Sequence, residues 1–190
     1  ANVLSGDKPA QEFIELVAAL GDEQQPDVWG VALGGLAELD RVISSDDRSA
    51  LQALVRNLVG AQVAQVGWSV APGDSDLRRR LRGLLLRGVG NLGDDRRVQE
   101  TARDVFSRLL VEPEAVDANV ADAAVGIVAA NGGAADFDRF LELRDGAGSP
   151  QDEVRYLRAA AAVPEQKTAS RLVDMVLEGG IRRQDASWVL

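Results

Sequence analysis

Apolar residues recur at helical spacing along almost the whole chain, and this periodicity constrains the fold more than any other feature of the sequence. Phe13, Leu16, Val17 and Leu20, for example, stand at positions i, i+3, i+4 and i+7, which lie on one face of a helix. No stretch alternates strictly between apolar and polar residues, as a half-buried strand would. The sequence therefore predicts an all-α fold.

The predicted helices are separated by turn signals rich in Gly and Pro. We expect helices around 13–20, 36–43, 51–58, 77–92, 98–109, 120–127, 137–141, 154–161 and 169–176. Breaks fall at 67–73, 131–133, 146–150, 164 and 179–180. After residue 90, helix starts recur with roughly 30 to 40 residues per helix pair, which is typical of helical hairpins. We predict HEAT-like helical-hairpin repeats that form an α-solenoid or bowl.

Residues 1–190 are interpreted as a single helical-repeat domain that is a fragment, truncated at both ends, of a larger protein. The chain does not begin with Met. Near its other end, Asp185 has the chemistry of a helix N-cap, so residues 186–190 are predicted to form the first turn of a helix. One turn alone is barely stable, which suggests that the rest of that helix is missing.

The chain contains neither Cys nor His, and this absence excludes several chemistries at once. Without thiolates or imidazoles there is no cysteine nucleophile, no Ser-His-Asp triad and no zinc site of the usual type. Carboxylate, Lys, Tyr or Ser/Thr chemistry remains possible on composition alone, but we expect no catalytic, cofactor-binding or metal-binding residue in this chain. A disulfide framework is excluded too, and the cytoplasm is the predicted compartment.

The charge balance argues against nucleic acid as a partner. Thirty acidic residues against 21 basic ones give a formal net charge of -9, which repels a phosphate backbone at long range. No apolar run approaches the length of a membrane span, and no signal peptide opens the chain. We expect neither a nucleic-acid partner nor a membrane partner.

The segment GVGNLG at 88–93 matches the G-x-G-x-x-G pattern of dinucleotide-binding loops. That mechanism needs a strand before the motif, whereas the preceding residues belong to a predicted helix. Close helix packing and a helix stop explain these glycines better. A carboxylate-only hydrolase is a further alternative, but no acidic pair stands out, and Asp136 and Asp138 are interpreted as a solvated helix start.

The predicted helix over 77–92 carries the densest basic cluster. A helical projection places Arg79 opposite the apolar stripe and the other arginines on its shoulders. Acidic residues precede two of them by four positions, Asp74 before Arg78 and Asp76 before Arg80, and this order favours helix ion pairs. A surface salt-bridge role is favoured over ligand binding. The cluster comprises Arg78, Arg79, Arg80, Arg82 and Arg87.

Several ordered segments together resemble the C-terminal helical domain of the aminopeptidase N family of zinc metallopeptidases, to which puromycin-sensitive aminopeptidase is related. The resemblance is strongest over residues 67–185. The segments are GWSVAPGDSDL at 67–77, LRGLLL at 81–86, LGD at 92–94, NG at 131–132, ADF at 135–137 and IRRQD at 181–185.

This resemblance implies that the parent protein removes N-terminal residues from peptides with a zinc-activated water. The family's H-E-x-x-H zinc helix requires His, and its G-A-M-E-N segment is absent here. Both would belong to an upstream catalytic domain of the same polypeptide, which would hold the zinc. The implied role of this chain in proteolysis is non-catalytic: it shapes and limits access to the chamber that holds the peptide substrate.

Basic side chains on such a wall would attract the C-terminal carboxylate of a peptide, so four arginines are candidate peptide contacts. Gln184 and Asp185 are expected instead to fix a loop and cap a helix. The alternative function is a HEAT-like protein-interaction scaffold unrelated to peptidases. The four candidates are Arg79, Arg82, Arg87 and Arg183.

Overall fold

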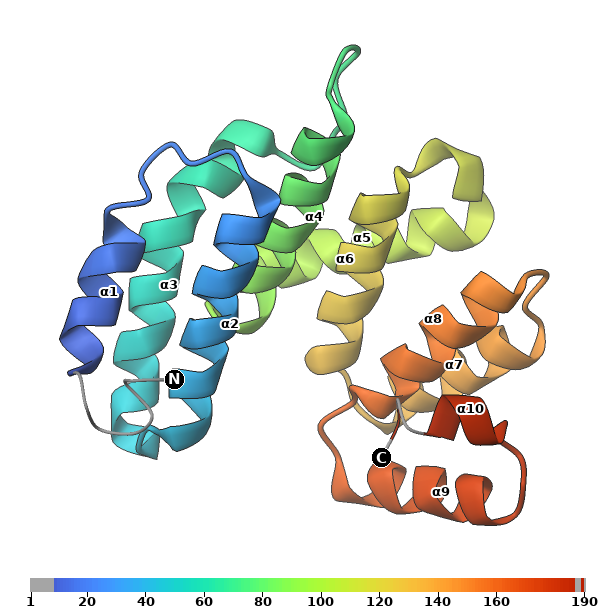
Figure 1. Ribbon diagram of the computed structural model, residues 1–190. Coiled ribbons are helices and arrows are strands. Elements are labelled where there is room, and N and C mark those ends of the chain that lie inside the picture. The colour runs from blue at the N-terminus through green and yellow to red at the C-terminus, as the bar shows by residue number, and fades with distance from the viewer. Residues whose placement is uncertain (1–8, 187–188, 190) are drawn as a thin grey trace. The chain divides into compact units, whose positions relative to one another are not determined.

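The computed structural model describes residues 9–186 and 189, which contain ten α-helices, one 3-10 helix and no strand (Figure 1). The prediction of an all-α fold is confirmed. The elements are α1 (Ala10–Ala18), α2 (Pro26–Val42), α3 (Ser45–Val66), α4 (Asp76–Asn91), α5 (Arg96–Val111), η1 (Pro113–Ala115), α6 (Ala118–Ala130), α7 (Ala134–Asp145), α8 (Pro150–Ala161), α9 (Gln166–Leu177) and α10 (Arg183–Ala186).

Side-chain caps explain where several helices begin. Ser44 and Ser75 each accept a hydrogen bond from a backbone N–H in the first turn, before α3 and α4 respectively. The cap of α5 is Asp95 rather than its neighbour Asp94, because the Oδ1 of Asp95 accepts from the backbone N–H groups of Arg97 and Val98. Asp94 instead adopts a left-handed conformation, with φ of 45°.

Helix α2 is much longer than the sequence predicts, because it begins at Pro26 rather than near residue 36. Pro26 lies in the first turn, where its missing N–H costs nothing. Trp29 and Leu33 are buried in this early part. Three glycines between residues 30 and 35 lower the local helix propensity, and packing of the apolar face overrides them.

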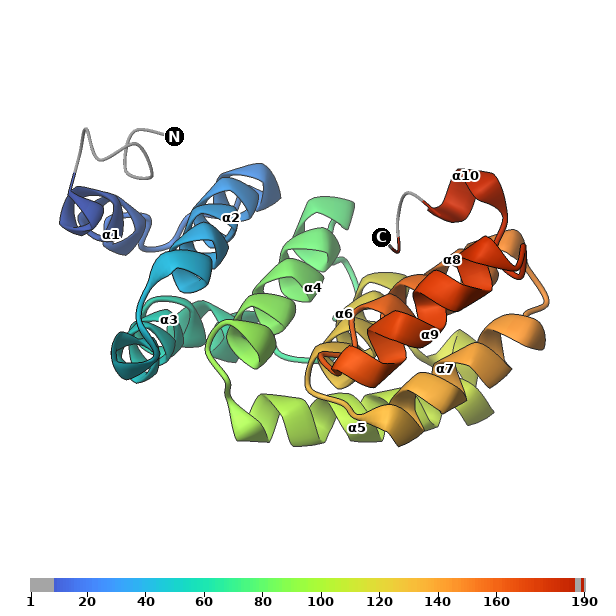
Figure 2. The same ribbon diagram turned by 90° about the horizontal axis from the view of Figure 1, so that it is seen from below.

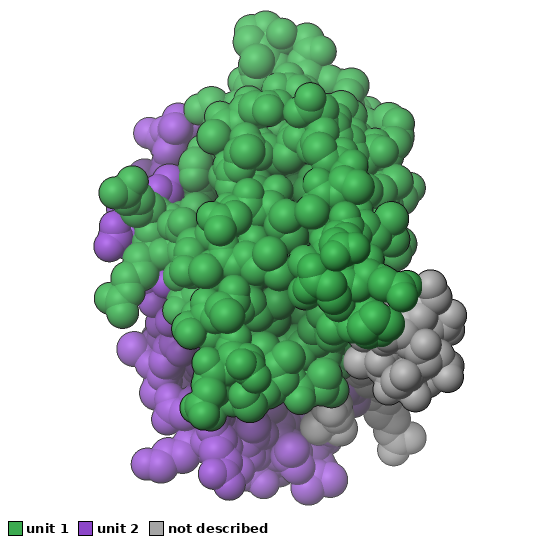
Figure 3. Space-filling view, turned by 90° about the vertical axis from the view of Figure 1, so that its left-hand side faces the viewer, with its two compact units in different colours: residues 1–98, 117–120 green, residues 99–116, 121–190 purple. Residues whose placement is uncertain are grey.

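The helices form two compact units (Figure 3). Unit 1 consists of residues 1–98 and 117–120, and unit 2 consists of residues 99–116 and 121–190. The interpretation as a single helical-repeat domain, and the HEAT-like solenoid or bowl, stay predictions. Among the described residues, no helix is both long enough and apolar enough to cross a membrane.

In unit 1, α4 packs against both α2 and α3 (Figures 1 and 2). Its buried residues cover most of its circumference rather than one stripe. Leu36 of α2, Val55 of α3 and Leu85 of α4 are fully buried in one core. Burial of apolar surface on this scale is the main stabilising contribution to such a bundle.

Two glycines of α4 permit close helix contacts. A Cβ at Gly83 would stand 2.6 Å from the backbone oxygen of Asn119, at the start of α6. A Cβ at Gly88 would stand 2.8 Å from Leu33 of α2. Gly88 opens the GVGNLG segment, which is helical up to Asn91. The interpretation of these glycines as helix packing and a helix stop is confirmed.

In unit 2, the helices follow one another at nearly constant spacing. Pro150 of α8 follows Ala118 of α6 by 32 residues, and Arg183 of α10 follows Pro150 by 33. In the alternate series, Gln166 of α9 follows Ala134 of α7 by 32. Helix α8 packs against both α7 and α9. The spacing agrees with the hairpin length that the sequence predicts.

Ion pairs join alternate helices of unit 2, and the two residues of each pair are equally far apart in the sequence. Arg103 of α5 donates to Asp136 at 3.0 Å, and Arg171 of α9 donates to Asp138 at 2.7 Å; each pair is separated by 33 residues. Asp136 also accepts from the backbone N–H of Gly133, so the prediction that these two acids begin a helix is confirmed.

The last described helix differs from its prediction. Asp185 does not precede a helix, because α10 begins at Arg183 and the backbone N–H of Asp185 already donates to Arg182 at 2.8 Å. Asp185 is buried, with 8% of its surface exposed, so it lies inside the turn rather than at its cap. Most of the predicted turn, residues 187, 188 and 190, lies outside the described residues.

We expect Gly83→Ala to destabilise the protein by roughly 1–3 kcal/mol, because the new Cβ meets backbone that cannot move away cheaply. The matched control is Gly60→Ala in the middle of α3, where a Cβ meets nothing within 4 Å. That change is expected to stabilise by about 0.5–1 kcal/mol through helix propensity. Urea unfolding measures both, and equal stability of the two variants would contradict the proposed α4–α6 contact.

Candidate functional site

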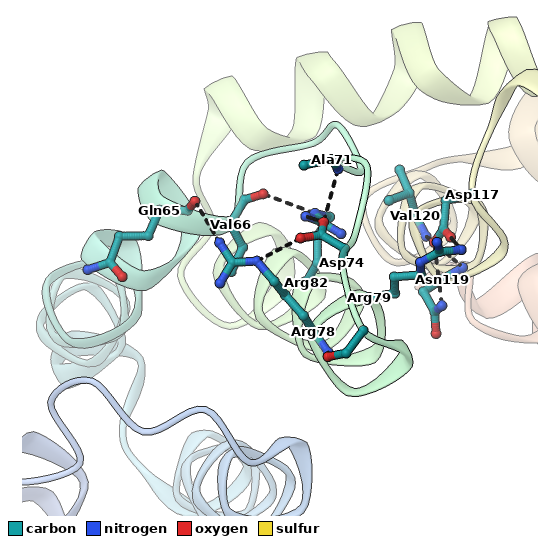
Figure 4. A network of polar contacts seen from close by, with 11 residues as sticks. Gln65, Val66, Ala71, Asp74, Arg78, Arg79, Arg82, Asp117, Asn119 and Val120 are labelled. Atoms are coloured by element: carbon teal, nitrogen blue, oxygen red, sulfur yellow. Dashed lines mark hydrogen bonds and ion pairs between the residues drawn. The ribbon is translucent and has the colours of Figure 1, made fainter.

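Arg82 is the most deeply buried charged residue of α4, with 1% of its surface exposed (Figure 4). Its Nε donates to the backbone oxygen of Val66 at 3.0 Å, and its Nη2 donates to Oδ2 of Asp74 at 2.5 Å. The side chain therefore ties the end of α3 and the loop before α4 to the body of α4. The expectation that Arg82 lies on a solvated shoulder of the helix is wrong.

Three donor groups contact the carboxylate of Asp74, at the end of the 67–75 loop. Besides Arg82, it accepts from the backbone N–H of Ala71 at 3.0 Å and pairs with Nε of Arg78 at 3.1 Å. The predicted pair between Asp74 and Arg78 is confirmed. The hydrogen bond from Arg82, followed by that from Ala71, lowers the pKa of Asp74 below its ordinary value of 3.8, although partial burial opposes this.

The sequence contained one signal for the burial of Arg82. Arg82, Leu86 and Val89 stand at i, i+4 and i+7, and the two apolar members of this line are buried. A projection that assumes one apolar stripe misses this second line. It also misses Asp74 as the partner of Arg82, because the two are eight residues apart and meet only when the loop folds back.

The second predicted ion pair of the cluster is wrong. Nη2 of Arg80 lies 2.7 Å from Oδ1 of Asp27 on α2, rather than beside Asp76. Both side chains are largely exposed, so the pair contributes little to stability. Its effect is to join the outer edges of α2 and α4.

Arg79 stands near the start of α6. Its Nη1 lies 3.8 Å from Oδ2 of Asp117, at the outer limit of an ion pair, and its side chain is 40% exposed. Asp117 also caps α6, because its Oδ1 accepts from the backbone N–H groups of Asn119 and Val120 (Figure 4). Arg79 is thus loosely attached to a carboxylate that has another structural role.

Among the three candidate contacts whose side chains the structure describes, Arg87 is the most accessible. It is exposed on α4, and no ion pair or hydrogen bond of its side chain occurs within the described residues. The side chain of Arg183 lies outside what the structure describes. The structure therefore separates the candidates: Arg82 is enclosed, Arg79 is weakly paired and Arg87 is open to solvent.

A metal centre is not assembled by the described residues. No group of three or more His, Cys, Asp or Glu side chains is arranged to hold a metal ion there. The described part of this all-helical chain thus offers an exposed cationic position at Arg87 and a buried ion pair between Arg82 and Asp74.

Comparison with known proteins identifies the family of this chain. The family model described as ERAP1-like C-terminal domain matches residues 1–190, so the chain belongs to this family. The resemblance to the C-terminal helical domain of aminopeptidases is confirmed at the level of the family.

The similar proteins are aminopeptidases. The chain is 23% identical over 178 residues to the puromycin-sensitive aminopeptidase of Caenorhabditis elegans, an alignment that covers 92% of this chain and 19% of the relative. It is 22% identical over 196 residues to aminopeptidase M1-A of Oryza sativa subsp. japonica, covering 98% and 22%. It is also 22% identical over 185 residues to the alanine/arginine aminopeptidase of Saccharomyces cerevisiae, covering 95% and 22%. The chain spans about a fifth of the length of these curated relatives.

We expect Arg82→Met to lower the unfolding midpoint by roughly 5 °C or more, because it leaves the carboxylate of Asp74 without its main partner. Arg82→Lys is expected to recover only part of the loss, since one ammonium replaces a guanidinium that reaches both Val66 and Asp74. Arg87→Met, on the exposed face of the same helix, is the control and should change the midpoint little. Thermal unfolding measures the midpoint of each of the three variants. Equal effects of the substitutions at positions 82 and 87 would contradict the burial of Arg82.

The stabilisation from Asp74 should depend on pH in a defined direction. Because its pKa is lowered in the folded state, the contribution is present above the ordinary value of 3.8 and is lost as pH falls through the lower folded value. The difference in unfolding free energy between the natural protein and Asp74→Asn should be constant near neutral pH and shrink below about pH 4. A difference that stays constant down to pH 2 would argue against the charged pair.

Proposed function

We propose that this chain is the non-catalytic C-terminal domain of a zinc aminopeptidase that removes N-terminal residues from peptides, and that it shapes and limits access to the substrate chamber. The observation that carries this proposal is the match of residues 1–190 to the ERAP1-like C-terminal domain family. The chain also corresponds to only about a fifth of each aminopeptidase relative, which leaves ample sequence for a separate catalytic domain.

The catalytic zinc belongs to that other part of the polypeptide. The residues present here do not fit a catalytic zinc site, because the sequence has no His or Cys and the described acids form no suitable cluster. The partners of this chain are then the upstream catalytic domain and the peptide substrate. The cytoplasm is the proposed compartment for the whole protein.

Within the candidate contacts, Arg87 is the residue best suited to meet a peptide. It is exposed, and within the described residues its guanidinium is not committed to an acid, so a carboxylate can approach at no cost of a broken pair. Arg79 offers a weaker version of the same contact, since Asp117 competes for it at 3.8 Å. Contact through Arg82 would require its pair with Asp74 to open. Arg183 is kept as a proposed contact from the sequence.

The competing function is a protein-interaction scaffold with no relation to peptidases. Membership of the ERAP1-like family favours the aminopeptidase proposal. The natural reading frame separates the two, because the aminopeptidase family that this chain resembles carries an H-E-x-x-H zinc helix, which would be encoded upstream of residue 1. A frame without that segment would remove the proposal.

The chain by itself is expected to bind no zinc stoichiometrically and to hydrolyse no aminoacyl reporter amide, because it lacks the ligands that both require. Metal analysis of the purified chain, combined with a reporter assay, measures this. Metal-dependent turnover that co-purifies with the chain through successive columns would contradict the non-catalytic role.

In the full-length enzyme, Arg87→Glu is expected to weaken binding of longer peptides while leaving a one-residue reporter almost unaffected. Losing one charge-assisted contact should raise KM for a long peptide by roughly tenfold, which corresponds to about 1.4 kcal/mol. The KM of Arg87→Lys for a long peptide should lie between that of the natural enzyme and that of Arg87→Glu.

The matched control is Arg41→Glu, which changes another exposed arginine of unit 1; within the described residues Arg41 pairs with Glu38. This variant should change the activity on neither the long peptide nor the one-residue reporter. Equal losses on both substrates in Arg87→Glu would indicate a fold defect, and no change on either would remove Arg87 from the proposed peptide surface.

A further inference from the structure

Asn131 is followed directly by Gly132, and no other Asn of the sequence precedes a Gly. In an Asn-Gly dipeptide the backbone nitrogen of the glycine can attack the side-chain amide before it, because the missing Cβ leaves that nitrogen unshielded and the backbone adaptable. The dipeptide lies at the end of α6, where the chain turns toward α7 (Figure 1). Asn131 is exposed, so water has access to its amide.

Packing at this turn requires glycine at position 132. A Cβ there would stand 2.7 Å from the backbone oxygen of Val128 and 2.7 Å from Oδ2 of Asp136. The first neighbour is helix backbone, and the second is held in place because it accepts from the backbone N–H of Gly133 at 3.1 Å. A bulkier residue after Asn131 would slow the attack, but the packing excludes one. Any protection must therefore come from the fold.

Hydrogen bonds occupy every group that the attack needs. Nδ2 of Asn131 donates to the backbone oxygen of Ile127 at 2.9 Å, one turn earlier in α6. Its Oδ1 accepts from Nε2 of Gln99, on α5, at 3.1 Å. The backbone N–H of Gly132 donates to the oxygen of Ala129 at 3.2 Å. The side chain must leave both partners, and the last turn of α6 must open, before the Gly132 nitrogen can reach Cγ.

We propose that Asn131 is a site of spontaneous deamidation, and that its hydrogen bonds to Ile127 and Gln99 hold the reaction to the rate at which the last turn of α6 opens. In the open turn, the nitrogen of Gly132 loses its proton to hydroxide and attacks Cγ of Asn131. A new C–N bond forms, the bond from Cγ to Nδ2 breaks, and Nδ2 takes a proton from water and leaves as ammonia. Water then opens the cyclic imide at either carbonyl, which gives Asp or isoaspartate at position 131.

The product fits this turn less well than Asn131 does. A carboxylate cannot donate to the oxygen of Ile127, and a negative charge at the C-terminal end of α6 opposes the helix dipole. The carboxylate of Asp136, which lies close to Gly132, adds repulsion between like charges. Deamidation therefore loosens the place where α5, α6 and α7 meet, and it is irreversible because the ammonia is lost. This proposal does not depend on the peptidase function.

The test follows the mass gain that results when the side-chain NH2 is replaced by OH, located at residue 131 by peptide mapping. In mildly alkaline buffer the gain should accumulate at least about tenfold faster in guanidinium chloride than in the native protein, because the unfolded chain lacks the protecting hydrogen bonds. Asn131→Gln should abolish the gain at this position. Equal rates in the native and unfolded protein, or a gain at another residue instead, would overturn the proposal.

Gln99→Ala tests one protecting bond by itself. Loss of a single hydrogen bond should speed deamidation of the native protein by roughly threefold to tenfold. The matched control is Arg171→Ala, which breaks the link from α9 to Asp138 and should leave the rate unchanged. Equal acceleration in the two variants would indicate general loosening, and an unchanged rate in Gln99→Ala would show that the bond does not protect; either result contradicts the proposal.

Asn131→Asp reproduces the charge of one product. We expect it to lower the thermal unfolding midpoint by about 2 °C or more, because the donor to Ile127 is lost and a charge is added beside Asp136. A midpoint equal to that of the natural protein would refute the proposed loosening.

Discussion

Helix α4 has apolar or small residues around most of its circumference, and the arrangement of unit 1 follows from the need to cover them. Helices α2 and α3 pack on two sides, and the start of α6 approaches the side where Gly83 leaves room for its backbone. Because Arg82 is enclosed by the same packing, its guanidinium needs partners that are buried with it. The loop before α4 supplies them, in the carboxylate of Asp74 and the backbone oxygen of Val66.

The arginines of α4 therefore do different things although they are neighbours in the sequence. Arg82 holds a loop, Arg80 joins two helix edges through Asp27, and Arg87 projects into solvent. Our proposal that a peptide carboxylate meets Arg87 rather than Arg82 rests on this difference, since Arg87 is exposed and Arg82 is enclosed with Asp74.

Unit 2 obtains its order from repetition. Helices begin at nearly equal intervals, and Arg–Asp pairs 33 residues apart link α5 to α7 and α7 to α9. In a helical array of this kind each helix contacts mainly its neighbours. This is consistent with membership of a family of C-terminal domains whose relatives are aminopeptidases, and with a chain that has no His or Cys.

The sequence by itself determined the helical class, most helix positions, the breaks between them and the family. These depend on local periodicity, on caps such as Ser44 and Ser75, and on ordered segments such as 67–77, all of which are visible along a single stretch of chain. The lack of thiols and imidazoles likewise limits the chemistry through composition alone.

Only the tertiary structure decided which side chains meet. It buried Arg82, paired Arg80 with Asp27, and left Val173 and Leu177 exposed. The physical reason is that a helical projection states the direction of a side chain but not what stands opposite it. Whether an arginine contacts solvent or a carboxylate depends on the packing of segments that are distant in sequence, and local periodicity carries no information about that packing.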